Sequence, residues 1–110
     1  MTDQHTIVVV EDSFVGNFLK AVLERRGYRV MPASREDALN LLDCRSPAVA
    51  LLITNTPRVF VDFGDRIPLL YTAAFPDPVN TAGWRRWMSL RKPFQTSELL
   101  RCVERLLASV

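Results

Sequence analysis

Two kinds of apolar segment alternate along this chain, and their alternation is the feature that most restricts its fold. Short continuous apolar runs, typical of strands buried on both faces, cover residues 7–10, 28–31, 49–53, 67–72 and 88–91. Apolar residues at helical spacing follow residue 12, Ser34 and Thr96. Because neighbouring parallel strands are joined by crossovers, the alternation predicts one five-stranded parallel sheet with helices on both faces.

One of the predicted crossovers is unusually short. About a dozen residues separate the strand that ends at Ile53 from the strand that starts at Ile67, close to the minimum for joining parallel neighbours. We therefore expect the third helix to be shortened or missing, with Phe60 and Phe63 on its buried side. The Asp77-Pro78 pair predicts a capped short helix in the next crossover.

Length, charge and cysteine content narrow the function classes. The chain has 110 residues, which predicts a single domain over residues 1–110. The net charge of +2 is too small to indicate a nucleic-acid or membrane partner, and no leader or membrane-spanning apolar run is evident, so we expect a cytoplasmic protein. We expect Cys44 and Cys102 to be small buried hydrophobes, with no disulfide and no metal-binding role.

Polar side chains stand just after several predicted strands, where an open parallel sheet forms its functional crevice. They are Glu11 and Asp12 after the first strand, Thr54 after the third, Thr72 at the end of the fourth and Lys92 after the fifth. Paired carboxylates can hold a divalent cation, and a hydroxyl and an ammonium group can bind a phosphoryl oxygen. Any one of these residues alone is better explained as a solvated loop end.

Taken together, these residues resemble the response-regulator receiver domain, the CheY-like phosphoacceptor module of two-component signalling. The residues that carry the resemblance are Val8-Val9-Val10-Glu11-Asp12-Ser13, Ile67-Pro68-Leu69-Leu70-Tyr71-Thr72-Ala73, and Lys92-Pro93-Phe94 with Glu98-Leu99-Leu100. The resemblance implies a flavodoxin-like three-layer α/β sandwich with strand order 2-1-3-4-5. It also implies a cis peptide bond between Lys92 and Pro93.

The chain departs from that family at the phosphoacceptor. The family places an aspartate four residues before a proline, and the residue four before Pro57 is Ile53, which has no nucleophile. Thr54 cannot replace it, because adjacent strand residues point to opposite faces. We therefore expect no metal, or at most weak Mg²⁺ binding at Glu11 and Asp12, and we expect Lys92 to pair with one of these two acids.

A second departure concerns the position of the family's switching aromatic residue. That position lies three residues before the lysine, and Ser89 occupies it here. Together with the missing acceptor, this change predicts a domain in which binding survives without phosphoryl chemistry, because a fold can outlast its function.

The most distinctive predicted surface is basic and lies in the last third of the chain. Residues 81–110 carry six basic and two acidic residues, hence +4, against −2 for the first eighty. The expected partner surface comprises Trp84, Arg85, Arg86, Arg91, Arg101 and Arg105. An equally weighted interpretation buries both Trp84 and Trp87 in the core and leaves the arginines as a solvated face.

The sequence thus predicts a degenerate receiver domain that acts as a protein-protein interaction module without aspartate phosphorylation. It predicts no enzyme activity and no cofactor, and the expected partner is a signalling protein or a second copy of the chain. One alternative is a receiver phosphorylated on a non-standard acceptor such as Asp62 or Asp65. The other is a small nucleic-acid-binding module that uses the basic C-terminal third, which the low net charge disfavours.

Overall fold

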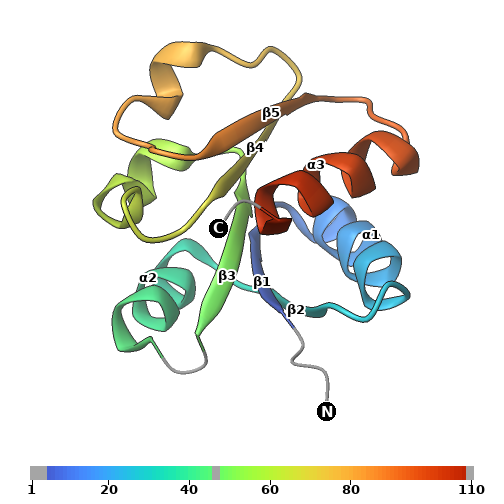
Figure 1. Cartoon of the computed structure of the whole chain (residues 1–110), viewed down its shortest axis with the longest axis horizontal. Helices are drawn as coiled ribbons and strands as arrows, with labels where there is room; N and C mark the ends of the chain where they lie inside the picture. The colour runs from blue at the N-terminus through green and yellow to red at the C-terminus, as the bar shows by residue number, and fades with distance from the viewer. Residues whose placement is uncertain (1–4, 46–47, 109–110) are drawn as a thin grey trace.

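A five-stranded parallel sheet organises the chain, as predicted. The computed structural model describes residues 5–45 and 48–108. The strands are β1 (Thr6–Val10), β2 (Arg29–Pro32), β3 (Val49–Thr54), β4 (Leu69–Ala73) and β5 (Trp87–Arg91), in the spatial order β2-β1-β3-β4-β5 (Figure 1). Their bounds differ from the predicted ones by no more than two residues at either end.

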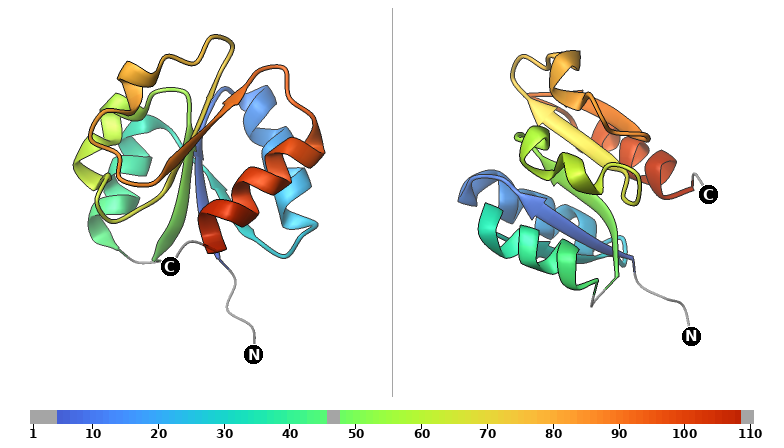
Figure 2. Two further views of the ribbon diagram at one scale, coloured as in Figure 1. Left: turned by 45° about the horizontal axis from the view of Figure 1, so that its top comes forward. Right: turned by 90° about the vertical axis from the view of Figure 1, so that its left-hand side faces the viewer.

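Helical segments cover both faces of the sheet and complete the predicted three layers (Figure 2). Helices α1 (Ser13–Glu24) and α3 (Thr96–Ala108) lie on one face, whose buried cluster includes Val9, Ile53 and Leu70. Helix α2 (Arg35–Cys44) and the 3-10 helices η1 (Pro57–Phe63) and η2 (Pro78–Thr81) lie on the other. The sheet is thus buried on both sides, which explains its continuous apolar strands.

Side-chain caps set the starts of the two helices that follow β1 and β2. Asp12 Oδ1 accepts the backbone N–H of Val15 at 3.0 Å, and Ser34 Oγ accepts that of Asp37 at 3.1 Å. Each cap satisfies a donor that the first helical turn leaves unpaired. Both helices therefore begin immediately after their strands end, at the carboxyl edge of the sheet.

The two short crossovers are built around buried aromatic residues. Phe60 of η1 is fully buried and Phe63 packs against the same cluster, as the sequence predicts. Trp84, in the second crossover, is also buried, and its Nε1 donates a hydrogen bond to the carbonyl oxygen of Pro57 at 3.1 Å. This bond joins the two short crossovers where longer helices are missing.

The two cysteines lie in different environments, and one of them corrects the prediction. Cys102 is buried on α3, and this burial raises the pKa of its thiol. Cys44 is exposed, because it ends α2 and the chain turns away at Arg45, which adopts a left-handed conformation with φ of 58°. Both are free thiols.

Across residues 5–45 and 48–108 there is no helix with the length and apolar character needed to cross a bilayer.

The contact between the two short crossovers leads to a stability prediction. A Cβ at Gly64 would overlap the carbonyl oxygen of Gly83, a backbone atom that cannot move aside alone. We expect Gly64→Ala to lower the free energy of unfolding by about 1–3 kcal/mol, the usual cost of overpacking. Urea unfolding followed by circular dichroism measures the change.

Gly16→Ala is the matched control, because a Cβ there meets nothing within 4 Å and the residue lies inside α1. Its free energy of unfolding should rise by about 0.5–1 kcal/mol, because alanine is favoured over glycine inside a helix. Equal effects of the two substitutions would contradict the packing assigned to Gly64.

Candidate functional site

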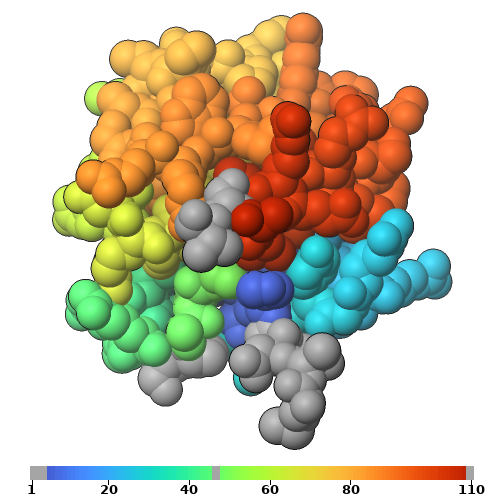
Figure 3. Space-filling model, viewed as in Figure 1, coloured from blue at the N-terminus to red at the C-terminus, as the bar shows by residue number. Residues whose placement is uncertain are grey.

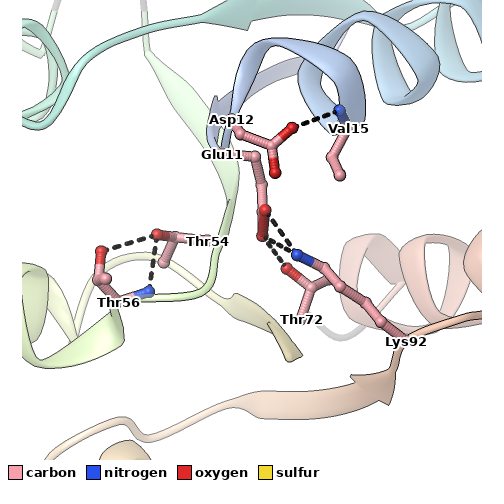
Figure 4. A network of polar contacts seen from close by, with 7 residues as sticks. All are labelled: Glu11, Asp12, Val15, Thr54, Thr56, Thr72 and Lys92. Carbon is pink, nitrogen blue, oxygen red and sulfur yellow. Dashed lines mark hydrogen bonds and ion pairs between the residues drawn. The ribbon is translucent and has the colours of Figure 1, made fainter. Parts of the chain in front are cut away.

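Glu11, Thr72 and Lys92 meet at the carboxyl edge of the sheet (Figure 4). The Lys92 ammonium donates to Oε2 of Glu11 at 2.8 Å and to Oε1 at 3.2 Å, and the Thr72 hydroxyl donates to Oε1 at 2.5 Å. The Glu11 side chain is fully buried, whereas that of Lys92 is 24% exposed. The carboxylate is thus paired and hydrogen-bonded, as a buried charge must be.

Strand register explains why these side chains converge. Val9 of β1 pairs with Ile53 of β3, which in turn pairs with Leu70 of β4, and all three belong to the cluster beneath α1 and α3. Glu11 and Thr72 lie two residues beyond Val9 and Leu70, so they project to the same face. Lys92 directly follows β5, and its peptide bond to Pro93 is cis, as the resemblance implied.

The two adjacent acids have different roles. Glu11 takes the lysine, which confirms the prediction that Lys92 pairs with one of them. Asp12 is exposed and caps α1 through its bond to the Val15 N–H. The acidic pair therefore serves as one half of an ion pair and one helix cap.

Ile53 contributes no polar group to this site. Its side chain is fully buried within the cluster beneath α1 and α3. Thr54, the next residue, is also buried, and its Oγ1 accepts the Thr56 N–H at 3.1 Å and lies 3.2 Å from the Thr56 hydroxyl oxygen. Figure 4 shows this threonine pair apart from the group formed by Glu11, Thr72 and Lys92.

The residues present do not fit the Mg²⁺ ion that a receiver-like pocket implies. Both Glu11 oxygens are bonded to Lys92, and one Asp12 oxygen caps α1. Ile53, at the position where the resemblance implies an aspartate, has no side-chain oxygen. Mg²⁺ requires near-octahedral oxygen ligation, which these groups do not provide. Nowhere in the described parts of the chain do three or more His, Cys, Asp or Glu side chains gather as a metal site would require.

The structure corrects one residue of the predicted partner surface. Trp84 is only 5% exposed and cannot belong to it, because its ring fills the core between the short crossovers. Trp87 is 38% exposed and takes its place. We define the arginine face as Arg85, Arg86, Trp87, Arg91, Arg101 and Arg105. Of these, Arg86 is half-buried and the other five are exposed.

The arginine face wraps around the β5 edge of the sheet. Arg101 and Arg105 lie on α3, which covers one side of the sheet, whereas the side chains of Trp87 and Arg91 project to the other side. In Figure 3 the orange atoms around β5 and the red atoms of α3 form one adjoining surface. A hollow of about 360 Å³ opens on it, lined by Arg85, Arg86, Trp87, Met88, Arg105 and Leu106. Positive charge is therefore concentrated around an actual depression.

Sequence reasoning missed an aromatic contact at the other end of β5. The Arg91 guanidinium lies over the Phe75 ring, 5.7 Å from its centroid, and the Phe75 side chain is 82% exposed. Such stacking holds an arginine in place while leaving its charge available. The separation of sixteen residues along the chain leaves no sequence signal for this pair.

Comparison with solved structures identifies the fold. The signal receiver domain of an HD domain-containing protein from Pseudomonas fluorescens Pf-5 superposes with a TM-score of 0.78 at 22% identity, over 97% of this chain and 89% of that one. The chemotaxis protein CheY4 of Vibrio cholerae gives 0.80 at 21% identity, over 96% and 100%. A response regulator receiver protein from Sinorhizobium medicae WSM419 gives 0.78 at 20% identity, over 97% of each chain.

The likeness to known proteins is one of structure. No protein-family model matches the sequence, and no curated protein matches it. The chain therefore has the receiver-domain fold, the five-stranded flavodoxin-like architecture that the sequence predicted.

The buried ion pair leads to a second stability prediction. Lys92→Met removes the partner of a fully buried carboxylate. We expect the free energy of unfolding to fall by about 3 kcal/mol. This value is at the low end for a broken buried ion pair, because Lys92 is partly exposed. Adding Glu11→Gln should recover most of the loss, since no unpaired charge then remains. Chemical denaturation of the single and double variants measures the coupling.

Lys20→Met is the control, because Lys20 is an exposed lysine on α1 and its loss should change stability by no more than about 0.5 kcal/mol. If Lys92→Met lowered the free energy of unfolding no more than Lys20→Met does, the ion pair would have no structural role.

Proposed function

We propose that this chain is a degenerate receiver domain that acts as a phosphorylation-independent protein-protein interaction module in two-component-type signalling. The observation that carries the proposal is Ile53, an apolar, fully buried residue at the position where a receiver holds its phosphoacceptor. An acyl phosphate forms only on a carboxylate, so the standard chemistry has no starting point here.

The surroundings of Ile53 support the same conclusion. In this chain the lysine that would neutralise a phosphoryl group is engaged by Glu11, and so is the Thr72 hydroxyl. The switch position holds Ser89, which is exposed on β5 and has no ring to reorient. Acceptor, cation site and switch are thus all altered, while the fold is retained.

The alternative acceptors do not belong to the group formed by Glu11, Thr72 and Lys92. Asp62 and Asp65 are exposed in or just after η1, and Asp65 precedes β4 at the amino edge of the sheet. Its Oδ1 is 3.8 Å from Nε of Arg85, an exposed pair, whereas Lys92 stands at the carboxyl edge. This placement favours the interaction module over a receiver with a displaced acceptor.

The arginine face is the surface we assign to the partner. Arginine and tryptophan dominate the energetics of protein interfaces, and five arginines and one half-exposed tryptophan gather here. The burial of Trp84 removes one of the two aromatic rings that a nucleic-acid interface would stack on. A signalling protein with an acidic surface fits this face best, and we place the interaction in the cytoplasm.

Incubation with acetyl phosphate and Mg²⁺ tests the missing chemistry. We expect the intact mass to stay unchanged, because no carboxylate stands at residue 53. A receiver domain that keeps its aspartate, treated in parallel, should gain about 80 Da, the mass of one phosphoryl group. A stoichiometric gain of that size in this chain would refute the proposal, and fragmentation would locate the acceptor.

Charge reversal tests the arginine face. Arg85→Glu combined with Arg101→Glu should weaken binding to a purified partner at least about tenfold, or about 1.4 kcal/mol, through lost electrostatic complementarity. Titration calorimetry measures the affinity, and circular dichroism checks that the variant is folded.

The matched control is Lys20→Glu with Arg25→Glu, the same charge change on an exposed residue of α1 and on the exposed residue that caps its C-terminus. Helix α1 packs beside β2 at the opposite edge of the sheet. If the control weakened binding as much as the test variant, the interface would not lie on the arginine face.

A further inference from the structure

Strand β5 ends the sheet, and its hydrogen bonds show which backbone groups it uses. Among the strands of the described residues, it pairs with β4 alone. The Leu69 N–H donates to the Arg86 carbonyl at 3.0 Å, and the Lys92 N–H donates to the Ala73 carbonyl at 2.8 Å. Because successive peptide groups in a strand point to opposite sides, the even-numbered residues of β5 bond to β4.

The odd-numbered residues of β5 therefore direct their backbone groups to the open edge. Trp87, Ser89 and Arg91 each present one N–H and one C=O there, and all three residues are exposed. Among the described elements, β5 packs mainly against β4 and α3, and the left view of Figure 2 shows it as the strand nearest the viewer. Such an edge is a template for another strand.

The short second crossover explains why this side of β5 is uncovered. Its only helical segment is the four-residue η2, too short to cover a five-residue strand. The Trp87, Ser89 and Arg91 side chains share the face of Leu69 and Tyr71, which is the face of η1 and η2. Strand and side chains are thus accessible together.

The opposite edge of the sheet is blocked, which makes β5 distinctive. In β2 the N–H groups of Arg29 and Ala33 bond to β1, so Val30 and Pro32 face outward. Pro32 has no N–H, and proline is one of the residues that protect an edge from pairing. No proline occurs within β5.

The charge around β5 identifies the kind of strand that it would accept. Arg85 and Arg91 are exposed at either end of it, and the hollow lined by Arg85, Arg86 and Arg105 opens beside Trp87. Arg86 and Arg105 already have other contacts, but they keep their charge. Asp65 lies beside this group, its Oδ1 3.8 Å from Nε of Arg85.

We propose that β5 binds an extended acidic segment of a partner protein as a sixth strand of the sheet. The proposal rests on the interaction role assigned above and specifies how the partner is held. Backbone hydrogen bonds to Trp87, Ser89 and Arg91 supply affinity, and acidic side chains of the segment face the arginines. A second copy of this chain is disfavoured as the occupant, because pairing two β5 strands would bring both sets of arginines together.

A synthetic peptide tests the proposal directly. The probe has about eight residues, a strand's length, with glutamate alternating with valine or threonine. In the free protein the Trp87, Ser89 and Arg91 amides should exchange rapidly with solvent, and saturating peptide should slow their exchange about tenfold or more. Two-dimensional NMR reports each amide.

Two control peptides separate strand addition from charge attraction. Lysine in place of glutamate should abolish binding, and N-methylation of alternate residues, which removes donors but keeps charge, should weaken it about tenfold or more. Undiminished binding of the N-methylated peptide would overturn strand addition. So would protection confined to α3, self-association through β5 in sedimentation, or no saturable binding up to about 1 mM of the acidic peptide.

A pair of variants makes the same test from the protein side. Ser89→Pro deletes an outward N–H without removing a bond to β4, and proline is tolerated at such edge positions. It should weaken peptide binding about tenfold, whereas Ser89→Ala, which keeps the N–H, should bind normally. If Ser89→Pro does not fold, the N-methylated peptide alone decides the question.

The two proposals can fail separately. If Arg85→Glu with Arg101→Glu weakens peptide binding while Ser89→Pro and N-methylation do not, the arginine face is an interface but strand addition is wrong. A phosphoryl adduct with acetyl phosphate would instead refute the phosphorylation-independent role and leave the binding mode intact.

Discussion

The ion pair between Glu11 and Lys92 links the first strand of this chain to the turn after the last. It spans 81 residues of sequence and includes the hydroxyl of Thr72, so three of the five strands contribute to one buried carboxylate. A buried ion pair seldom adds much net stability, but removing either partner leaves a charge that the core cannot solvate. The arrangement of β1, β4 and β5 at the carboxyl edge therefore depends on keeping both residues.

The same pair determines what the site can do. A lysine that is free to move can neutralise an incoming anion, whereas Lys92 is held against both oxygens of Glu11. Ile53 is buried in the cluster beneath α1 and α3 and offers no polar group at the carboxyl edge. Under the proposed function, binding falls to surfaces that the packing does not use, and the exposed arginines around β5 and α3 form such a surface.

Sequence reasoning succeeded where a local pattern fixes the structure. Continuous apolar runs identified the strands, Ser34 identified a helix start through its cap, and the lysine-proline turn placed Lys92 beside the acids. It failed where burial depends on distant partners. Trp84 is buried because Pro57 offers a carbonyl acceptor, and Cys44 is exposed because α2 ends there, and neither fact is visible in the flanking residues.

The two short crossovers leave one edge of the sheet uncovered. A parallel sheet buries both faces only if each crossover carries enough helix, and here η1 and η2 provide little. The chain compensates with Phe60 and Trp84, large rings that fill the layer over β3 and β4 without extending to β5. Trp87, Ser89 and Arg91 are then uncovered on their face and at their edge. The arginines beside them discourage pairing between copies, so the exposed strand remains available to a partner of opposite charge.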